Sequence, residues 1–455
     1  MAVPAPRRRR PRRGPARPRR PGRARPDRRT RPRGLPRRTP TMTRPPGPQH
    51  QERSTPDMPT PDPEAPAAGE APYDRNALDV VAHYHHPVKA PLLREVMLPL
   101  ATATATATSA SADGIVAHVE RHWLHGPHLR LRLQGTDPAR VAHTAEAAAA
   151  HIRTWLHAHP SHSDLTDAQL LERAAESGRA ELLPPPYGPV HPDNTVRIEP
   201  VDRSPVRDLL GADGTRLRED LLHAGLDALR SGADFLGRHG DTDRARLRLA
   251  VTALAAHACA HPGGLTGGHW SYVSHLEDFL LHDDPDGRLR ATFERHAERA
   301  GDTVTALVGR IADGHADDWE QAWAGFSQGA WRLTQQRHDA GADLHGNPLA
   351  YRARAAATGD AAAYERWNQD IRTRYSEFHR LLRRADPQGA MWSRPDYLIH
   401  RACTNALYRL LTVCDVRPLE RYLAAHLVVR AVPALTGCDW RTEIDAVINA
   451  TETQT

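Results

Sequence analysis

The sequence predicts an α+β fold, in which a small mixed or antiparallel sheet packs on a large helical body and a disordered Arg/Pro-rich tail precedes both. Three observations support this prediction. Strand-like segments occur only between residues 78 and 135 and at 195–200, the chain after residue 214 has a helical pattern, and residues 1–44 contain almost nothing that builds a core. We expect a tail and acidic linker at 1–75, a sheet region at 76–210 and a helical region at 211–450.

The tail dominates the charge of the chain. Residues 1–44 hold 18 arginines and one acid, Asp27, so they carry +17, and subtracting this from the +6 of the whole chain leaves −11 for the rest. A segment so rich in Arg and Pro is predicted to be disordered. As a functional arm it would bind RNA or an anionic membrane. We favour the alternative that it is translated GC-rich DNA upstream of a start at Met42 or Met58.

Composition limits what the rest of the chain can be. Hydrophobic residues make up 39% and aromatic residues 5%, so the core is expected to consist mainly of Leu, Ala and Val. The sequence contains neither an apolar run of about eighteen residues nor a signal peptide. The cysteines lack the spacing of a zinc site or a redox pair: Cys259, Cys403, Cys414 and Cys438. These observations predict a cytoplasmic protein with reduced thiols and no membrane association.

The elements of the sheet region are predicted from residue patterns. The segment LDVVAHYHH reads as a strand, Pro91 opens a helix with apolar residues at helical spacing, and Gly126-Pro127 reads as a turn. In order, we expect a strand at 78–86, a helix from Pro91 through Leu100, a loop over ATATATATSASADG, and strands at 115–123 and 128–133.

The last of these strands, HLRLRL, has a strict alternation. Leu129, Leu131 and Leu133 fall on one face of a strand, and Arg130 and Arg132 fall on the other. Periodicity alone predicts a buried leucine face and a solvated basic face.

Helices dominate the chain after this strand. Residues 138–157 are Ala-rich and helical, the Pro-rich segment after them ends in a short strand at 195–200, and Ser393 is expected to cap the helix that begins near Pro395. Further helices are expected at 214–237, 242–260, 270–282, 288–312, 317–337, 361–384, 394–413 and 416–432.

Two of these helices carry polar residues on one face. Asp396, His400 and Thr404 are four residues apart, so the acid is expected to orient His400 and keep it partly protonated near neutral pH. On the helix at 270–282, the polar side opposes Val273, Leu276 and Phe279 and consists of Ser271, Ser274, His275 and Asp278. The alternative for each helix is an ordinary solvated face.

Cofactor chemistry is not predicted. His83, His85 and His86 form an HYHH cluster, but no acid or cysteine at ligand spacing joins them, so we expect no metal. There is no GxGxxG or GxxxxGK[ST] motif, and hence no nucleotide cofactor is expected. A Ser/His/Asp hydrolase is also not expected, because the residues cluster on one helix without the strand-to-helix elbow that exposes a nucleophile.

Several segments resemble one protein family. The run HWLHGPHLRLRL, with Trp123 and His128, resembles the signature of the C-terminal, SpaB-C-like domain of lantibiotic dehydratases and of the split thiopeptide-type bacteriocin biosynthesis proteins. The segment IHRACTN, with His400 and Asn405, resembles a late-helix motif of the same family, although its gap to Asn405 is one residue longer. The segments PDNTVRIEP, SYVSHLEDFL and VRPLERYLAAHLVVRAV are also similar, particularly to the split thiopeptide proteins.

The resemblance implies a lyase that matures a ribosomally synthesised peptide by eliminating glutamate from glutamylated Ser or Thr. It implies that Arg130 and Arg132 clamp the glutamyl carboxylate and that His400 moves the proton, with Arg130 facing the substrate. The substrate-binding residues expected are His128, Trp123, Ser271, Ser274, His275 and Asn405. One departure counts against this activity, because family eliminases use a further arginine near the first strand and this chain has none there before Arg94.

Two alternatives remain open. The first is the formal [4+2] cycloaddition that joins two dehydroalanines into a pyridine, for which hydroxyl and imidazole groups are better suited than an arginine clamp. The second is a scaffold that holds the precursor peptide without catalysis. The expected partners are the precursor peptide, whose leader adds as a strand at a sheet edge, and a glutamylating protein that uses glutamyl-tRNA. Nucleic-acid binding is expected only of the tail, and a homodimer is left open.

Overall fold

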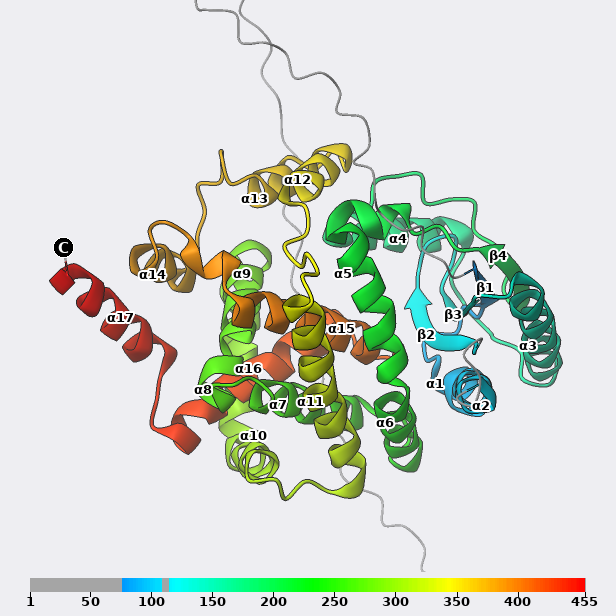
Figure 1. Ribbon diagram of the computed structural model, residues 1–455, viewed down its shortest axis with the longest axis horizontal. Coiled ribbons are helices and arrows are strands. Elements are labelled where there is room, and N and C mark those ends of the chain that lie inside the picture. Colours follow the sequence, from blue (N-terminus) through cyan, green and yellow to red (C-terminus); the bar gives the residue numbers. More distant parts are fainter. Residues whose placement is uncertain (1–75, 109–113, 455) are drawn as a thin grey trace, which may run out of the picture. The chain divides into compact units, whose positions relative to one another are not determined.

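The computed structural model describes residues 76–108 and 114–454, and within them the expected α+β class is confirmed (Figure 1). The expected disordered tail and the end of the Ala/Thr tract lie outside the described residues. The strands are β1 (Asn76–His83), β2 (Val116–His122), β3 (His128–Gly135) and β4 (Thr195–Pro200). The helices of the sheet region are α1 (Ala90–Leu92), the π-helical η1 (Leu93–Met97), α2 (Leu98–Thr108), α3 (Pro138–Ala158) and α4 (Asp167–Glu181).

The helical body comes after β4 in the sequence. It consists of α5 (Ser204–Ala224), α6 (Leu226–Arg238), α7 (Asp243–Cys259), α8 (Gly264–Gly268), α9 (Trp270–Asp283), α10 (Arg288–Ala312), α11 (Asp318–Asp339), α12 (Pro348–Ala357), α13 (Ala361–Trp367), α14 (Glu377–Ala385), the 3-10 turn η2 (Ala390–Ser393), α15 (Pro395–Val413), α16 (Pro418–Thr436) and α17 (Trp440–Gln454).

The sheet is antiparallel, with strand order β2-β3-β1-β4. Its register aligns Asp79 with Arg132 and His83 with His128, so polar residues meet across the strands. One face carries Leu129, Leu131 and Leu133, which are fully buried, as the alternation predicted. The opposite face is polar.

Helices cover both faces of the sheet (Figure 1). On the apolar face, α3 packs a stripe of alanines and larger aliphatic residues against β1, β3 and β4. This helix begins where Asp137 accepts hydrogen bonds from the backbone amides of Ala139 at 2.9 Å and Arg140 at 3.4 Å, with Pro138 in the first turn. On the polar face lies α5, which contributes Arg218 and Glu219.

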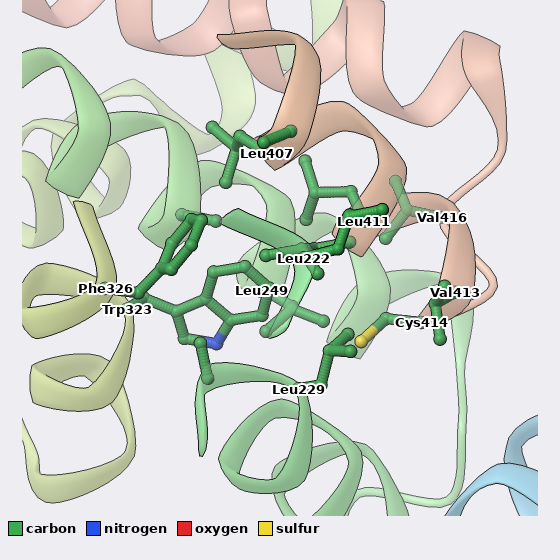
Figure 2. Close-up of a cluster of buried hydrophobic side chains, with 14 of the residues drawn as sticks. Leu222, Leu229, Leu249, Trp323, Phe326, Leu407, Leu411, Val413, Cys414 and Val416 are labelled. Atoms are coloured by element: carbon green, nitrogen blue, oxygen red, sulfur yellow. The ribbon is translucent and has the colours of Figure 1, made fainter. Parts of the chain in front are cut away.

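The core of the helical body forms around Trp323 on α11 (Figure 2). Trp323 and Phe326 pack with Leu229 of α6, Leu249 of α7 and Leu407 of α15. Helix α7 is buried almost all round between Leu249 and Ala258, so it has no polar face to present to solvent. This core fixes α15, which carries two of the predicted site residues.

Some predicted boundaries are wrong. Helix α2 continues through the Ala/Thr tract to Thr108, because alanine extends a helix already anchored by buried Met97 and Ala101. The helix predicted at 361–384 is two helices, α13 and α14, since Ser376 caps a new start by accepting from the amide of His379 at 3.4 Å. Arg394, not Ser393, precedes the first turn of α15. Helices α4, α8, α12 and α17 were not predicted.

None of the helices in residues 76–108 and 114–454 has both the length and the apolar character needed to cross a membrane.

Candidate functional site

Arg132 is a buried ion-pair partner. It is 5% exposed, its Nε and Nη2 each donate to Asp79 at 2.9 Å, and its Nη1 donates to Glu219 at 3.0 Å. Burial opposes its charge, but the hydrogen bonds to Asp79 and the charges of Asp79, Glu120 and Glu219 together outweigh burial and raise the pKa of Arg132 above its usual value. The guanidinium expected to clamp a substrate carboxylate is therefore engaged by carboxylates of the chain itself.

Arg130 occupies a more open position. Its side chain is 22% exposed, and its Nη2 donates to Glu120 at 3.2 Å. Glu120 also pairs with Arg218 from α5. Burial acts to raise the pKa of Glu120, but the charges of Arg130 and Arg218 outweigh it and hold that pKa well below the usual range. The Nε of Arg130 has no hydrogen-bond partner among the described residues.

A cavity of about 430 Å³ lies between this polar face and α5. One end is ionic and includes Arg130, Arg132, Arg218, Asp79 and Glu219. The other, which we call the imidazole end, is lined by His83, His122, His125, His128 and His191. Of the predicted site residues, Arg130, Arg132 and His128 therefore line one cavity.

Trp123 lies beside this cavity. Its ring stacks on His122 with centroids 5.2 Å apart, and its Nε1 donates to Glu181 at 2.9 Å. The second carboxylate oxygen of Glu181 pairs with Arg409 of α15 at 3.4 Å. Glu181 thus links the turn before β3 to the C-terminal half of α15.

The buried imidazoles predict acid lability. Burial, followed by the nearby rings of His191 and His85, lowers the pKa of His83 from 6.5 to about 3. Because the unfolded chain protonates this ring near pH 6.5 and the folded chain does so only near 3, stability is lost as the pH falls between these values. We expect urea unfolding to show a lower free energy at about pH 5 than at about pH 7.5, with a smaller difference in His83→Phe. An unchanged difference in His83→Phe would show that other groups carry the effect.

A second cluster assembles around α9. The Oγ of Ser271 lies 3.1 Å from Nε2 of His400, and the Oγ of Ser274 lies 3.0 Å from Nε2 of His379. The Nδ1 of His275 lies 3.1 Å from the hydroxyl of Tyr408. The polar side of α9 therefore faces α14 and α15 in three hydroxyl–imidazole pairs, which is more specific than a solvated face.

The geometry around His400 fixes its tautomer. Its Nε2 lies 3.1 Å from the carbonyl oxygen of Gly268, which only accepts, so Nε2 carries the proton and Ser271 also accepts from it. Ser271 keeps its own proton available for donation. The Nδ1 of His400 has no hydrogen-bond partner in the described part of the chain.

His400 is also uncharged. Burial, together with the nearby rings of His257 and His261, holds the pKa of His400 well below 6.5. This differs from the protonated ring expected from Asp396, whose carboxylate instead binds Arg394 at 2.7 Å. Asp396 is therefore paired with Arg394, the residue that precedes the first turn of α15, and not with His400.

Gly268 is required for this contact. A Cβ at this position would overlap the backbone of Ala258 on α7, and neither backbone can yield without separating α7 from α8. We expect Gly268→Ala to lower the free energy of unfolding by about 1–3 kcal/mol and to displace the carbonyl that orients His400. Gly325→Ala on α11, where a Cβ meets open space, should instead be neutral or stabilising by about 0.5–1 kcal/mol. Equal losses in both variants by urea denaturation would contradict the packing argument.

The pair at Ser274 extends into a relay. His379 places its Nδ1 2.8 Å from the hydroxyl of Ser376, so a hydroxyl, an imidazole and a second hydroxyl are connected in line. Burial lowers the pKa of His379, which keeps its ring neutral. Neither His379 nor Tyr408 was predicted from the sequence. Tyr408 is three residues after Asn405 and so lies on the same face of α15, and this spacing is the one sequence signal that could have identified Tyr408.

The two predicted site residues on α15, Asn405 and His400, lie away from the arginines of β3. Asn405 is exposed on α15. His400 does not line the cavity. Along the axis of α15 it lies about 13.5 Å, at a rise of about 1.5 Å per residue, from Arg409, which pairs with Glu181 beside the cavity. The structure therefore places His400 in a different cluster from Arg130 and Arg132.

Neither a triad nor a metal centre forms from these groups. Asp278 is bound by Arg366 at 2.8 Å and by Arg372, which outweigh burial and lower the pKa of its carboxyl, so it does not orient His275. Among residues 76–108 and 114–454, no three His, Cys, Asp or Glu side chains are arranged to hold a metal ion.

Comparison with known proteins gives a family and a fold. The family model described as "Lantibiotic biosynthesis dehydratase C-term" matches residues 79–432. The solved structure "Pyridine synthase, TbtD, from thiomuracin biosynthesis" is 18% identical with a TM-score of 0.54, covering 80% of this chain and 99% of that one. A structure of TsrL is 17% identical with a TM-score of 0.50, covering 82% and 99%. No protein of curated function matches the sequence.

Proposed function

This chain belongs to the lantibiotic biosynthesis dehydratase C-terminal family, and we propose that it modifies a ribosomally synthesised precursor peptide. We further propose that its reaction is a formal [4+2] cycloaddition that forms a pyridine. The observation that carries this choice is the set of three hydroxyl–imidazole pairs on α9. Of these, the pair of His275 and Tyr408 is the most accessible, since His275 is exposed and Tyr408 is half-buried.

The chemistry needs such pairs. One dehydroalanine must present its amide as the imidate tautomer, so a proton leaves the amide nitrogen and a proton is donated to the carbonyl oxygen. Two carbon–carbon bonds then form with the second dehydroalanine, water carries away the former amide oxygen, and the leader departs as a carboxamide. A neutral imidazole accepts a proton and an adjacent hydroxyl donates one, so a pair such as His275 and Tyr408 serves both ends of the amide.

The arginine environment supports the same choice over glutamate elimination. Arg132 is engaged by Asp79 and Glu219, and β1 contains no arginine. Arg94, the next arginine along the chain, pairs with Asp241 at 3.5 Å. An eliminase clamp would therefore depend on Arg130 alone.

Glutamate elimination is the second candidate, and one observation favours it. Arg130 lines the cavity with its Nε unpaired among the described residues, which is a suitable donor for a glutamyl carboxylate. This candidate alone requires a glutamylating partner protein.

Leader binding by strand addition is a further part of the proposal. The sheet ends in β2 and β4. Helices α2, α5 and α15 pack on β2, whereas α3 packs on the apolar face of β4, so we assign strand addition to the less covered strand, β4.

Two peptides separate the reactions. A precursor peptide with two dehydroalanines should undergo ring closure, seen by mass spectrometry as release of the leader and loss of water. The same peptide bearing glutamylated serines should remain glutamylated. Loss of glutamate without ring closure would replace the proposal with elimination. Binding of both peptides with neither product would replace it with a non-catalytic scaffold.

A further inference from the structure

The imidazole end of the cavity holds hydrogen-bonding groups that neither of the two candidate reactions uses. His122, His128 and His83 lie side by side on β2, β3 and β1, in register across the sheet. The rings of His128 and His191 stand 5.2 Å and 4.9 Å from that of His83. Three strands and a loop thus bring these imidazoles to one end of one cavity.

Backbone contacts fix the free nitrogen of three of these rings. His128 places its Nδ1 2.9 Å from the carbonyl of Gly126, and His125 places its Nδ1 3.1 Å from that of Pro189. A carbonyl only accepts, so each Nδ1 carries the proton and each Nε2 is an acceptor. His122 accepts at Nδ1 from the amide of Leu124 at 3.0 Å, so its Nε2 is a donor.

His83 is the group that requires an explanation. It is 1% exposed and lines the cavity, yet neither of its ring nitrogens has a hydrogen-bond partner among the described residues. A buried polar group that is left without a hydrogen bond destabilises the folded state. Such groups are normally satisfied by a neighbouring residue, water or a ligand.

Charge restricts which ligand suits this end. Burial, then the charge of Arg130, holds the pKa values of His122 and His128 well below 6.5, so these rings are neutral near pH 7. The guanidiniums at the ionic end have carboxylate partners within the chain, Arg132 with Asp79 and Arg218 with Glu120. An anion bound at the imidazole end would have to compete with Glu120 for the charge of Arg130, whereas a neutral ligand that donates and accepts matches the mixed tautomers.

We propose that the imidazole end binds a neutral carboxamide of the substrate peptide, with the ring of His83 and its neighbours pairing with the amide N–H and C=O. The carboxamide is a backbone amide or the side chain of Asn or Gln. This inference rests on the proposed function in that the substrate is a peptide, and it holds for cycloaddition or elimination alike. The cavity admits a segment rather than a single atom group, because its volume is about 430 Å³.

Isosteric probes test the proposal without any turnover. The full chain, with 13C-labelled histidine rings, is titrated with propionamide and with propionate, each to about 100 mM because ligands of so few atoms bind weakly. We expect propionamide to shift the His83 and His128 signals saturably and propionate to leave them in place. N-methylacetamide is a secondary amide like the peptide backbone, whereas propionamide is a primary amide like the side chain of Asn or Gln. Tighter binding of N-methylacetamide would indicate a backbone amide, and tighter binding of propionamide would indicate a side chain.

Variants complete the test. His83→Phe should abolish the response of His128 to propionamide, whereas His151→Phe, on the exposed face of α3, should not. If His83→Phe fails to fold, His191→Phe at the half-buried margin is expected to weaken the response at least threefold. Equal shifts with propionate, or no saturable shift with any amide, would overturn the proposal. Loss of ring closure with the amide response intact would instead refute only the proposed reaction.

Discussion

Replacing Arg132 with methionine is expected to lower the free energy of unfolding by about 3–5 kcal/mol, because the buried carboxylate of Asp79 loses both of its hydrogen bonds to Arg132 and the buried carboxylate of Glu219 loses one of its two arginine partners. Asp79 is bound through both oxygens by Arg132, and Glu219 shares its Oε1 between Arg132 and Arg203. Methionine fills much of the arginine volume, so the loss reports the unpaired charges more than a void. Urea denaturation monitored by circular dichroism measures it.

Arg130→Met is the matched control on the same strand. Glu120 keeps Arg218 when Arg130 is removed, and Arg130 is partly exposed, so the cost should stay below about 1 kcal/mol. If the second candidate function holds, this variant loses turnover while remaining folded. A large loss of stability in Arg130→Met would show that the arginine face of β3 acts as a structural unit, and the distinction between the two arginines would fail.

The alternation of residues in β3 predicted which side chains share each face of the strand, but not which residues the arginines contact. Leu129, Leu131 and Leu133 are buried as expected, because period-two patterning is a local property. The arginines were expected to meet solvent or substrate. Their partner Asp79 is distant along the chain and faces Arg132 only because β1 pairs with β3 in this register.

The second cluster shows the same limit. Helical spacing alone selected Ser271, Ser274 and His275 as one face of α9. Their partners come from other helices, His379 on α14 and Tyr408 on α15, and no local pattern specifies which helices pack together. His400 was identified by its family motif, but its neutral state depends on burial beside His257 and His261, which the sequence does not reveal.

The largest expected effect on activity is at His275 and Tyr408. Tyr408→Phe removes only the hydroxyl, and His275→Ala removes the imidazole 3.1 Å from it. If the pair transfers protons to and from the reacting amide, each variant should lower kcat for ring closure by about 10²–10⁴-fold. Steady-state kinetics with the bis-dehydroalanine peptide measures this, with His296→Ala, an exposed histidine on α10, as the control.

A double-mutant cycle decides whether the two groups act as one unit. A proton acceptor is ineffective without its partner donor. The kcat of the double variant should therefore lie within about threefold of the kcat of the slower single variant. Effects that multiply would mean that each residue acts independently, for example by binding different parts of the peptide. If KM rises while kcat is retained, the pair binds the peptide without moving a proton, and the reacting amide must then be sought beside Ser271 and Ser274, whose hydroxyls are held by the neutral imidazoles of His400 and His379.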